Sequence, residues 1–296
     1  MNYNDNISLA PIVIFAYNRP DKLKQLLDSL EKNLEFKKSD LIFYIDNIKN
    51  DDDKINNEKV IEIAKNNHSA KSIIINVNKE NFGLKQNIIN GINKTFEIYK
   101  SAIFLEDDLV VSKHFLDYMN TALKLYDNNP NVLHISGYNF PNFRVNSNSS
   151  YFTKVMNCWG WATWKTKWEK NQNFTKNNIS NLNNKNRRKF NILGFEKDFE
   201  SQLIRNENNE LETWAIFWYQ HIFLENAYCL QPKSSLVQNT GMDGSGERDI
   251  HSTFYDGVLN RKKIKTFPKK TKYTLLNRFQ TTYFYIRKKI RKDFNL

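Results

Sequence analysis

The sequence predicts a doubly wound α/β fold, in which a mostly parallel sheet is flanked by helices. Two patterns predict this class. Short apolar runs, which are typical of buried strands, alternate with segments in which apolar residues recur at helical spacing. Polar side chains directly follow several of these runs, as expected where parallel strands end at a ligand-binding edge. With 296 residues, of which 40% are hydrophobic, the chain can bury the core of one large domain, or one and a half.

Strands and helices are expected to alternate from residue 11 to residue 136. The helices are recognised by apolar residues three and four positions apart, and Pro20 suits the first position of the first helix. The expected strands are 11–16, 40–46, 72–76, 101–105 and 131–136. The apolar helix positions are Leu23, Leu26, Leu27 and Leu30, then Val60, Ile61, Ile63 and Ala64, then Ile88, Ile89, Ile92 and Phe96, and then Phe115, Met119, Ala122 and Leu123.

The fourth expected strand runs into three consecutive carboxylates, Glu106, Asp107 and Asp108. Three acids at one strand end repel one another unless a cation neutralises them. A hard divalent ion, Mg²⁺ or Mn²⁺, fits here, because proteins hold such ions with one or two carboxylates together with substrate phosphates. The alternative is a solvated acidic turn, in which Asp108 or Ser112 caps the next helix.

Other polar side chains stand at the ends of neighbouring strands. Residues 17–19 follow the first strand, and Asp46 and Asn47 follow the second. Ligands bind at the carboxyl ends of the strands in doubly wound sheets, so these groups are expected to converge with the acidic triplet at one edge. That convergence favours the metal interpretation of the triplet.

Several function classes are excluded by motifs that the chain lacks. Residues 16–20, after the first strand, contain no glycine, so the fingerprint of dinucleotide-binding dehydrogenases is absent. The phosphate loop of P-loop NTPases is absent too. Cys158 and Cys229 have no metal or redox spacing, residues 1–10 show no signal pattern, and no apolar run reaches about 18 residues. These observations predict a cytoplasmic protein with free thiols.

An aromatic cluster marks residues 151–170. Trp161, Trp164 and Trp168 fall at helical spacing, so one helix face carrying them is expected to lie in the core. Trp159 is a candidate for contact with a sugar, because aromatic rings bind the apolar faces of sugars.

Three later segments carry further candidates. Residues 171–188 are rich in Asn and Lys, which predicts a mobile loop suited to a lid. Residues 210–224 predict a helix with one aromatic face, and Glu212 is expected in its first turn, where the helix dipole favours an acid. His221, on that face, is expected to pack rather than to bind a ligand. The loop 238–246 holds three glycines, so its backbone N–H groups can approach a diphosphate closely.

The net charge of +12 is concentrated in the tail, residues 261–296, which carries 13 Lys or Arg and one acid. The remaining 260 residues carry 31 bases and 31 acids, so a basic groove through the body is not predicted and no nucleic acid is expected as a partner. Aromatic and aliphatic residues alternate with the bases, which suits an anionic membrane surface. The alternatives are RNA binding, and a solvated tail with one terminal helix packed on the body.

One resemblance is carried by six segments, namely Ile12–Pro20, Tyr44–Asp46, Asn81–Lys85, Phe104–Leu109, Asn157–Lys165 and Val237–Gly246. The first four resemble the motifs of GT-A glycosyltransferases, whose fold is Rossmann-like with a mostly parallel sheet. The acidic triplet resembles their metal-binding Asp-x-Asp motif, in the Glu-Asp-Asp form of N-acetylglucosaminyltransferase I. The last two look like bacterial family 2-type sugar transferases of surface-polysaccharide synthesis.

The resemblance implies a metal site. Asp108 is expected to ligate Mn²⁺ or Mg²⁺, which bridges the donor diphosphate. Asp107 and Glu106 are expected to contact the metal shell, the ribose or the donor sugar. Many members of the family add a late histidine as a metal ligand, and His251 is the nearest one here. Arg248 stands near the usual position of that histidine and is the alternative, as a partner for phosphate.

The resemblance also implies a nucleotide pocket. Tyr17, Asn18 and Arg19 are expected to line it, Asp46 to bind the base, and Lys85 to lie near the ribose or phosphate. The alternatives are a strand-end turn residue for Asp46 and a solvated lysine in the first turn of a helix for Lys85.

A catalytic base is expected from the same resemblance. In an inverting enzyme a carboxylate takes the proton of the acceptor hydroxyl. The family places it just before a tryptophan, and Glu212 stands there, before Trp214. Related sequences usually carry Asp at this position, so Asp243 is retained as the rival. Trp159 is expected to touch the donor or the acceptor.

The expected function is therefore that of an inverting, metal-dependent hexosyl- or N-acetylhexosaminyltransferase. It would move a sugar from a nucleotide sugar, with UDP favoured, to a glycan or lipid-linked glycan in surface-polysaccharide synthesis. The alternatives are a sugar-1-phosphate nucleotidyltransferase, although its usual glycine-rich loop is missing, and a non-catalytic polysaccharide-assembly protein. The expected parts are a nucleotide-sugar half (1–136), an acceptor half (137–260) and the tail, which would hold this cytoplasmic protein at the inner face of the membrane.

Overall fold

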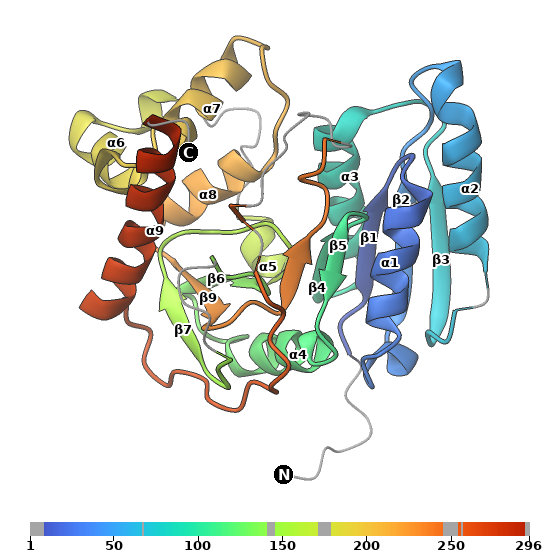
Figure 1. Ribbon diagram of the computed structural model, residues 1–296, viewed down its shortest axis with the longest axis horizontal. Helices are drawn as coiled ribbons and strands as arrows, with labels where there is room; N and C mark the ends of the chain where they lie inside the picture. The colour runs from blue at the N-terminus through green and yellow to red at the C-terminus, as the bar shows by residue number, and fades with distance from the viewer. Residues whose placement is uncertain are drawn as a thin grey trace.

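The computed structural model describes residues 9–66, 68–140, 146–170, 179–244, 254–255 and 257–293. Figure 1 shows a central sheet with helices packed against it and the last helix, α9, at one side of the molecule. The predicted α/β class, with a large and mostly parallel sheet flanked by helices, is confirmed. The division at residues 136 and 260 stays a prediction.

Over the described ranges, the main sheet has eight strands in the order β3-β2-β1-β4-β8-β6-β9-β7. The neighbouring strands β3, β2, β1 and β4 are all parallel, whereas β8 runs antiparallel between β4 and β6. Two further strands, β5 and β10, form a small antiparallel ribbon. The bounds are β1 (Ile12–Ala16), β2 (Asp40–Ile45), β3 (Ser72–Val77), β4 (Ser101–Glu106), β5 (Leu109–Val111), β6 (Val132–Ser136), β7 (Ser150–Thr153), β8 (Trp161–Trp164), β9 (Tyr228–Pro232) and β10 (Val237–Asn239).

Helices cover both faces of the sheet, because successive strand residues point in opposite directions. Ile12 and Ile14 of β1 pack in the same cluster as α1, α2 and α4, while Val13 and Phe15 pack with α3 and α8. Strands buried on both faces read as continuous apolar runs, which is why this half was recognisable in the sequence. The bounds are α1 (Pro20–Leu30), α2 (Lys54–Lys65), α3 (Gly83–Ile98), α4 (Phe115–Leu125), α5 (Lys165–Trp168), α6 (Asn184–Phe190), α7 (Asp198–Glu207), α8 (Ala215–Leu224) and α9 (Leu275–Asp293).

The register of the parallel strands brings their carboxyl ends together. Ala16 of β1 lies opposite Ile45 of β2, and Phe15 lies opposite Glu106 of β4. The polar segments that follow these three strands therefore start from one edge of the sheet, as the sequence predicts.

Trp161, Trp164 and Trp168 are in the core, as predicted, but they do not share one helix. Trp161 and Trp164 belong to β8, and Trp168 ends the short helix α5. No more than 3% of any of the three is exposed. Spacings of three and four residues do not separate one long helix from a short strand that leads into a short helix. Here strand pairing with β4 and β6 on both sides decides the outcome.

Two other expectations are corrected. The predicted loop 171–188 contains part of helix α6, which Asn183 caps by accepting a hydrogen bond from the N–H of Asn186; residues 171–178 lie outside the described ranges. Glu212 was expected in the first turn of a helix, but α8 begins only at Ala215, so Glu212 precedes it. Polar composition alone did not reveal a helix that is held by its cap and by packing at its end.

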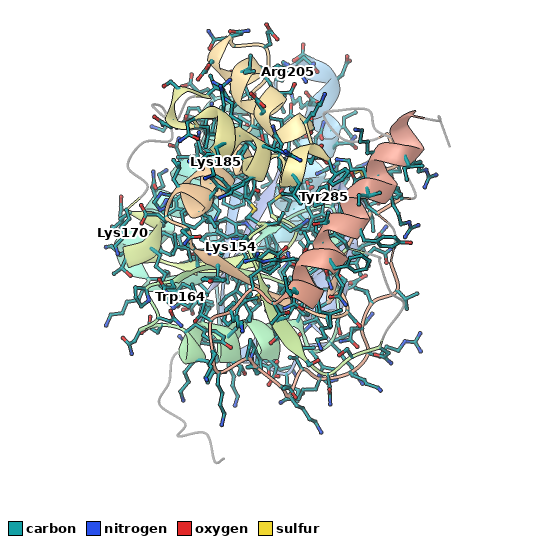
Figure 2. The ribbon with its side chains drawn as sticks, turned by 90° about the vertical axis from the view of Figure 1, so that its left-hand side faces the viewer. Lys154, Trp164, Lys170, Lys185, Arg205 and Tyr285 are labelled. Atoms are coloured by element: carbon teal, nitrogen blue, oxygen red, sulfur yellow. The ribbon has the colours of Figure 1, made fainter. Side chains whose placement is uncertain are left out.

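The tail forms helix α9, which packs on the body (Figure 1). Phe284 and Tyr285 are buried, with ring centroids 4.1 and 5.4 Å from that of Phe140. Figure 2 shows the helix lying along one side of the molecule, with Tyr285 labelled. This packing agrees with the alternative of a terminal helix on the body, and membrane binding by the tail stays a prediction. No helix in the described part of the chain is long and apolar enough to cross a membrane.

Candidate active site

The acidic triplet lies at the end of β4, in the turn that leads to β5. Only 2% of Asp107 and 9% of Asp108 are exposed to solvent. The backbone N–H of Asp107 donates to the carbonyl of Phe15 in β1, at 3.1 Å, which fixes the turn beside the end of the first strand. A solvated acidic turn is therefore not what the structure shows, because both aspartates are inside.

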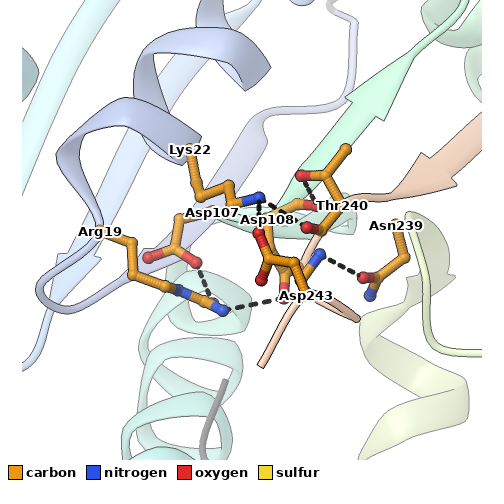
Figure 3. Close-up of polar contacts among 8 residues, drawn as sticks. Arg19, Lys22, Asp107, Asp108, Asn239, Thr240 and Asp243 are labelled. Atoms are coloured by element: carbon orange, nitrogen blue, oxygen red, sulfur yellow. Dashed lines mark hydrogen bonds and ion pairs between the residues drawn. The ribbon is translucent and has the colours of Figure 1, made fainter. Parts of the chain in front are cut away.

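Arg19 neutralises the two buried carboxylates (Figure 3). Its Nη2 donates to Oδ1 of Asp107, and its Nη1 lies 3.1 Å from Oδ2 of Asp108. Burial opposes the positive charge, but the negative charges of Asp107, Asp108 and Glu106 outweigh it and raise the pKa of the guanidinium. Burial also raises the pKa of Asp107, and Arg19 opposes that rise. Arg19 thus pairs with both aspartates in this structure, and its expected place in a nucleotide pocket stays a prediction.

Each aspartate has one oxygen that no residue in the described ranges satisfies. Oδ2 of Asp107 and Oδ1 of Asp108 are buried and accept no hydrogen bond from those residues. A buried carboxylate oxygen in this condition is costly unless a cation or donor satisfies it, and carboxylate oxygens suit Mg²⁺ or Mn²⁺. In the described ranges no three His, Cys, Asp or Glu side chains group as a metal site. The residues therefore fit a divalent ion that takes two protein ligands, with water and phosphate oxygens completing its shell.

The loop after β10 closes over Asp108. The N–H and hydroxyl of Thr240 both donate to the carbonyl of Asp108, at 2.8 and 2.9 Å. A Cβ on Gly241 would lie 2.2 Å from Oδ2 of Asp108, so only glycine fits without displacing that carboxylate. The pairing of β10 with β5 delivers the loop to this position. The first residues of this glycine-rich loop thus lie against Asp108, and its expected approach to a diphosphate stays a prediction.

Lys22 ties the same loop to helix α1 (Figure 3). Its Nζ lies 2.6 Å from the carbonyl of Thr240 and 2.6 Å from Oδ2 of Asp243. Asp243, the alternative catalytic base, therefore lies near Asp108 and is paired with the ammonium group of Lys22. The sequence analysis did not predict a role for Lys22. The only indication in the sequence was its position, one helical turn after Arg19. His251 and Arg248 lie outside the described residues.

Tyr17 and Asn18 converge on Asp53, at the start of α2. The hydroxyl of Tyr17 donates to one oxygen of Asp53 and the amide of Asn18 donates to the other, both at 2.5 Å. Burial, aided by the bond to Asp53, raises the pKa of Tyr17 to about 12. Asp53 was also missed, and the run Asp51–Asp53 was its only signal. This pairing ties the end of β1 to the start of α2, and the expected nucleotide-binding role of Tyr17 and Asn18 stays a prediction.

Asp46 caps helix α3. Its carboxylate accepts from the N–H groups of Phe82 and Gly83, at 2.9 and 2.8 Å, and from the side chain of Asn78 at 2.9 Å. The N–H of Asn47 adds a fourth bond, at 3.0 Å. Because the protein itself occupies both oxygens, this geometry favours the strand-end turn role of Asp46 over base binding.

Glu212 and Lys85 lie together near the start of α3. Oε2 of Glu212 is 3.7 Å from where a Cβ on Gly83 would stand. Nζ of Lys85 lies 3.5 Å from Oδ1 of Asn206 and 4.9 Å from the ring centroid of Phe217. Burial lowers the pKa of Lys85, and Glu212 opposes that change. The predicted base is exposed to solvent, unlike the buried aspartates.

Trp159 lies among aromatic side chains, beside the strand β10 that leads into the loop on Asp108. Its ring packs edge to face on Tyr138 and Tyr255, with centroids 4.5 and 5.6 Å away. The next residue, Gly160, has φ of +61° and packs so closely that an added Cβ would lie 2.8 Å from Val237 of β10. This places Trp159 next to the strand that carries the covering loop.

The structure thus brings Arg19, Asp107, Asp108 and Asp243 together, with Lys22 as an unpredicted member. Glu212 and Lys85 form a second charged group at the start of α3. Trp159 lies at a third border of the site.

No family model and no curated protein sequence matches the chain. Among solved structures, it is similar to the mannosyltransferase PcManGT from Pyrobaculum calidifontis in complex with GDP-Man and Mn²⁺, with a TM-score of 0.38 and 10% identity over 74% of this chain and 73% of that chain. TarS of S. aureus gives a TM-score of 0.36 and 15% identity over 55% of this chain. The bifunctional glycosyltransferase WbbM in its apo form gives 0.33 and 11% over 58%. The matches cover 30% of TarS and 34% of WbbM. At these values the likeness does not extend to the reaction of this chain.

Proposed function

We propose that this chain is an inverting, metal-dependent glycosyltransferase that takes a sugar from a nucleotide sugar, with UDP favoured. Its acceptor is a glycan or lipid-linked glycan of bacterial surface-polysaccharide synthesis. The observation that carries the proposal is the pair of buried aspartates at the end of β4, each with an oxygen that no group in the described part of the chain satisfies. Burying such a pair lowers the free energy of unfolding unless a ligand satisfies the two oxygens.

Asp107 and Asp108 would hold Mn²⁺ or Mg²⁺ through these two oxygens. When bound, the ion stabilises the charge of the leaving diphosphate. Arg19 and Lys22 supply further positive charge at the same edge. Gly241 keeps the space beside Asp108 free of a side chain.

Glu212 is the proposed base, and Asp243 remains its rival. In the transfer, the acceptor hydroxyl oxygen bonds to the anomeric carbon while the bond from that carbon to the diphosphate breaks, and the hydroxyl proton passes to the carboxylate. Glu212 is exposed to solvent, whereas Asp243 is held by Lys22 at 2.6 Å. A carboxylate engaged with a lysine is a weaker base, which supports Glu212.

The test is release of nucleoside diphosphate from a panel of UDP- and GDP-sugars, with Mn²⁺ or with EDTA. We expect release from the sugars of one nucleotide only when metal is present. The Glu212→Gln variant should lose about 10²–10⁴-fold in kcat, the usual worth of a general base, with donor affinity retained. Asp243→Asn serves as the comparison. No release from any donor would reject a sugar-transfer reaction, and a larger loss in Asp243→Asn would move the base to that residue.

We also propose that α9 holds the enzyme on an anionic membrane surface. One face of α9 is buried through Phe284 and Tyr285, but Leu276, Phe279 and Ile290 are 64%, 63% and 48% exposed. Exposed bases accompany them on the same helix, namely Arg278, Arg287, Lys289 and Arg291. Apolar anchors among bases are the pattern of interfacial helices, with about 1 kcal/mol per base near anionic lipid. Such a location would suit a lipid-linked acceptor.

Co-sedimentation with vesicles tests this contact. We expect the protein to bind vesicles rich in phosphatidylglycerol and not pure phosphatidylcholine, and a Leu276→Ser/Phe279→Ser double variant to lose most of that binding. Val258→Ser, which removes an apolar side chain that is 74% exposed outside α9, is the matched control and should bind like the wild type. Equal binding of the double variant and the wild type would reject α9 as the membrane surface.

A further inference from the structure

We infer that Arg19 is an exchangeable counter-ion, which neutralises Asp107 and Asp108 in the free protein and transfers to the donor diphosphate when the divalent ion binds. The inference rests on the proposed function, because it assigns Arg19 a task in donor binding at the same site. It makes binding of the ion and binding of the diphosphate depend on each other.

The starting point is the charge balance of the free site. Two carboxylates that are almost fully buried cannot both remain ionised beside each other without a cation. Arg19 supplies one through two separate nitrogens, and 21% of its side chain is still exposed. Lys22 cannot replace it, because Lys22 is committed to Thr240 and Asp243.

The second step is competition. The guanidinium uses one oxygen of each aspartate, and the other oxygen accepts no hydrogen bond from any residue that the structure describes. An ion that binds the free oxygens at about 2.0–2.2 Å would stand next to the positive charge of Arg19. Like charges at such a distance disfavour each other, so Arg19 weakens binding of the ion to the free protein.

The third step is the new partner. A guanidinium pairs with phosphate through two parallel hydrogen bonds, as it does with a carboxylate. When a nucleoside diphosphate arrives, Arg19 can leave the aspartates without losing its ionic partner, and the ion takes its place. The diphosphate should therefore strengthen Mn²⁺ binding, and this coupling should require Arg19.

The experiment is a Mn²⁺ titration, followed by calorimetry or by the relaxation rate of water protons, with and without UDP. In the wild type we expect weak Mn²⁺ binding alone and binding at least about tenfold tighter with saturating UDP, within the usual range of coupling energies. Arg19→Gln should bind Mn²⁺ alone about tenfold more tightly than the wild type and should show little further gain from UDP. Lys24→Gln, which removes an exposed charge of helix α1 that pairs with Asp28, is the control and should match the wild type.

Arg19→Lys guards against loss of folding in the glutamine variant. A lysine cannot span both aspartates in the same way, so Mn²⁺ alone should again bind more tightly than in the wild type, by a smaller factor. Mn²⁺ affinity that is unchanged or weaker in the folded Arg19 variants would overturn the inference. Failure of the wild type to bind any nucleotide would instead reject the donor site, while the comparison with Mn²⁺ alone would still judge Arg19.

Discussion

At the scale of single residues, Gly241 lets the loop after β10 lie directly against Asp108. The N–H and the hydroxyl of Thr240 donate to the carbonyl of Asp108, and the missing side chain of Gly241 leaves room for its carboxylate. The need for glycine here is steric, because an added Cβ would meet Oδ2 of Asp108 at 2.2 Å.

We expect Gly241→Ala to displace either the loop or Asp108. Metal-dependent nucleotide affinity should fall by about tenfold or more, because a misplacement of 1 Å in a site is worth that much or more. Thermal unfolding should change little, since the loop lies at the rim. Calorimetry with Mn²⁺ and nucleotide measures the first quantity. An alanine variant with unchanged metal-dependent affinity would show that the loop does not constrain Asp108.

His134 provides a pH-dependent contribution to stability. It is fully buried; Nδ1 accepts from the indole N–H of Trp218 at 3.2 Å, so Nε2 carries the proton that faces the carbonyl of Asn157 at 2.9 Å. Burial lowers the pKa of His134 to about 3. In an unfolded chain a histidine has a pKa of about 6.5. Between these values the unfolded chain binds a proton that the folded chain does not.

The free energy of unfolding should therefore fall as the pH falls below 6.5. From pH 7 to pH 5 the linkage contributes about 2 kcal/mol. In His134→Gln, which keeps a polar side chain but does not titrate, the loss over the same interval should be smaller by about that amount. Urea unfolding at the two pH values measures it. Equal losses in the variant and the wild type would show that His134 is not held neutral.

At the scale of elements, Asp46 joins β2 to α3. Its four hydrogen bonds satisfy the first N–H groups of the helix and the turn before it. Asp46→Ala should lower the free energy of unfolding by about 1–3 kcal/mol without any nucleotide present, because these buried donors lose their acceptor. Asp28→Ala, which removes an exposed acid of α1, is the control. If Asp46→Ala unfolds like the wild type and only nucleotide affinity drops, the base-binding role is favoured instead.

Helix α9 has two faces with opposite tasks. Phe284 is 1% exposed and Phe279 is 63% exposed on the same helix. Phe284→Ala should cost about 3–5 kcal/mol of the free energy of unfolding, as for other buried phenylalanines, whereas Phe279→Ala should cost little. Denaturant unfolding of the pair measures the difference. Similar costs for both would mean that α9 does not pack on the body through the face that carries Phe284.

Some elements could be predicted from the sequence and others could not, for a physical reason. The parallel strands β1, β2 and β4 are covered on both faces, so each is one apolar run. The strands β7, β9 and β10 are short and partly polar, and the sequence pattern predicted none of them. Trp161 and Trp164 were expected to be helical because spacing does not reveal pairing partners that are distant in the chain.

The candidate site divides in the same way. The acidic triplet and its place at a strand end followed from local pattern. The roles of Lys22 and Asp53 could not be predicted from local pattern. Lys22 contacts Thr240 and Asp243, and Asp53 contacts Tyr17 and Asn18, so these contacts join segments that are distant in the sequence. Which oxygen of each aspartate is left free also required the three-dimensional arrangement.

At the scale of the whole molecule, the excess positive charge and the candidate active site lie in different segments of the chain. The carboxyl ends of β1 and β4 carry the candidate site, while the excess positive charge lies in residues 261–296 at the end of the chain. Donor binding and attachment to a surface should therefore be separable: variants of α9 should change vesicle binding, and variants of Asp107 or Asp108 should not.

The central claim is that Asp107 and Asp108 form a metal-dependent nucleotide site. The most direct measurement is calorimetric titration of UDP, GDP and CMP, each with Mn²⁺ and again with EDTA, on the wild type and on Asp108→Ala. We predict that one nucleoside diphosphate binds the wild type only in the presence of Mn²⁺ and that Asp108→Ala, still folded, loses this binding. Binding of no nucleotide, equal binding in EDTA, or full metal-dependent binding by Asp108→Ala would contradict the claim.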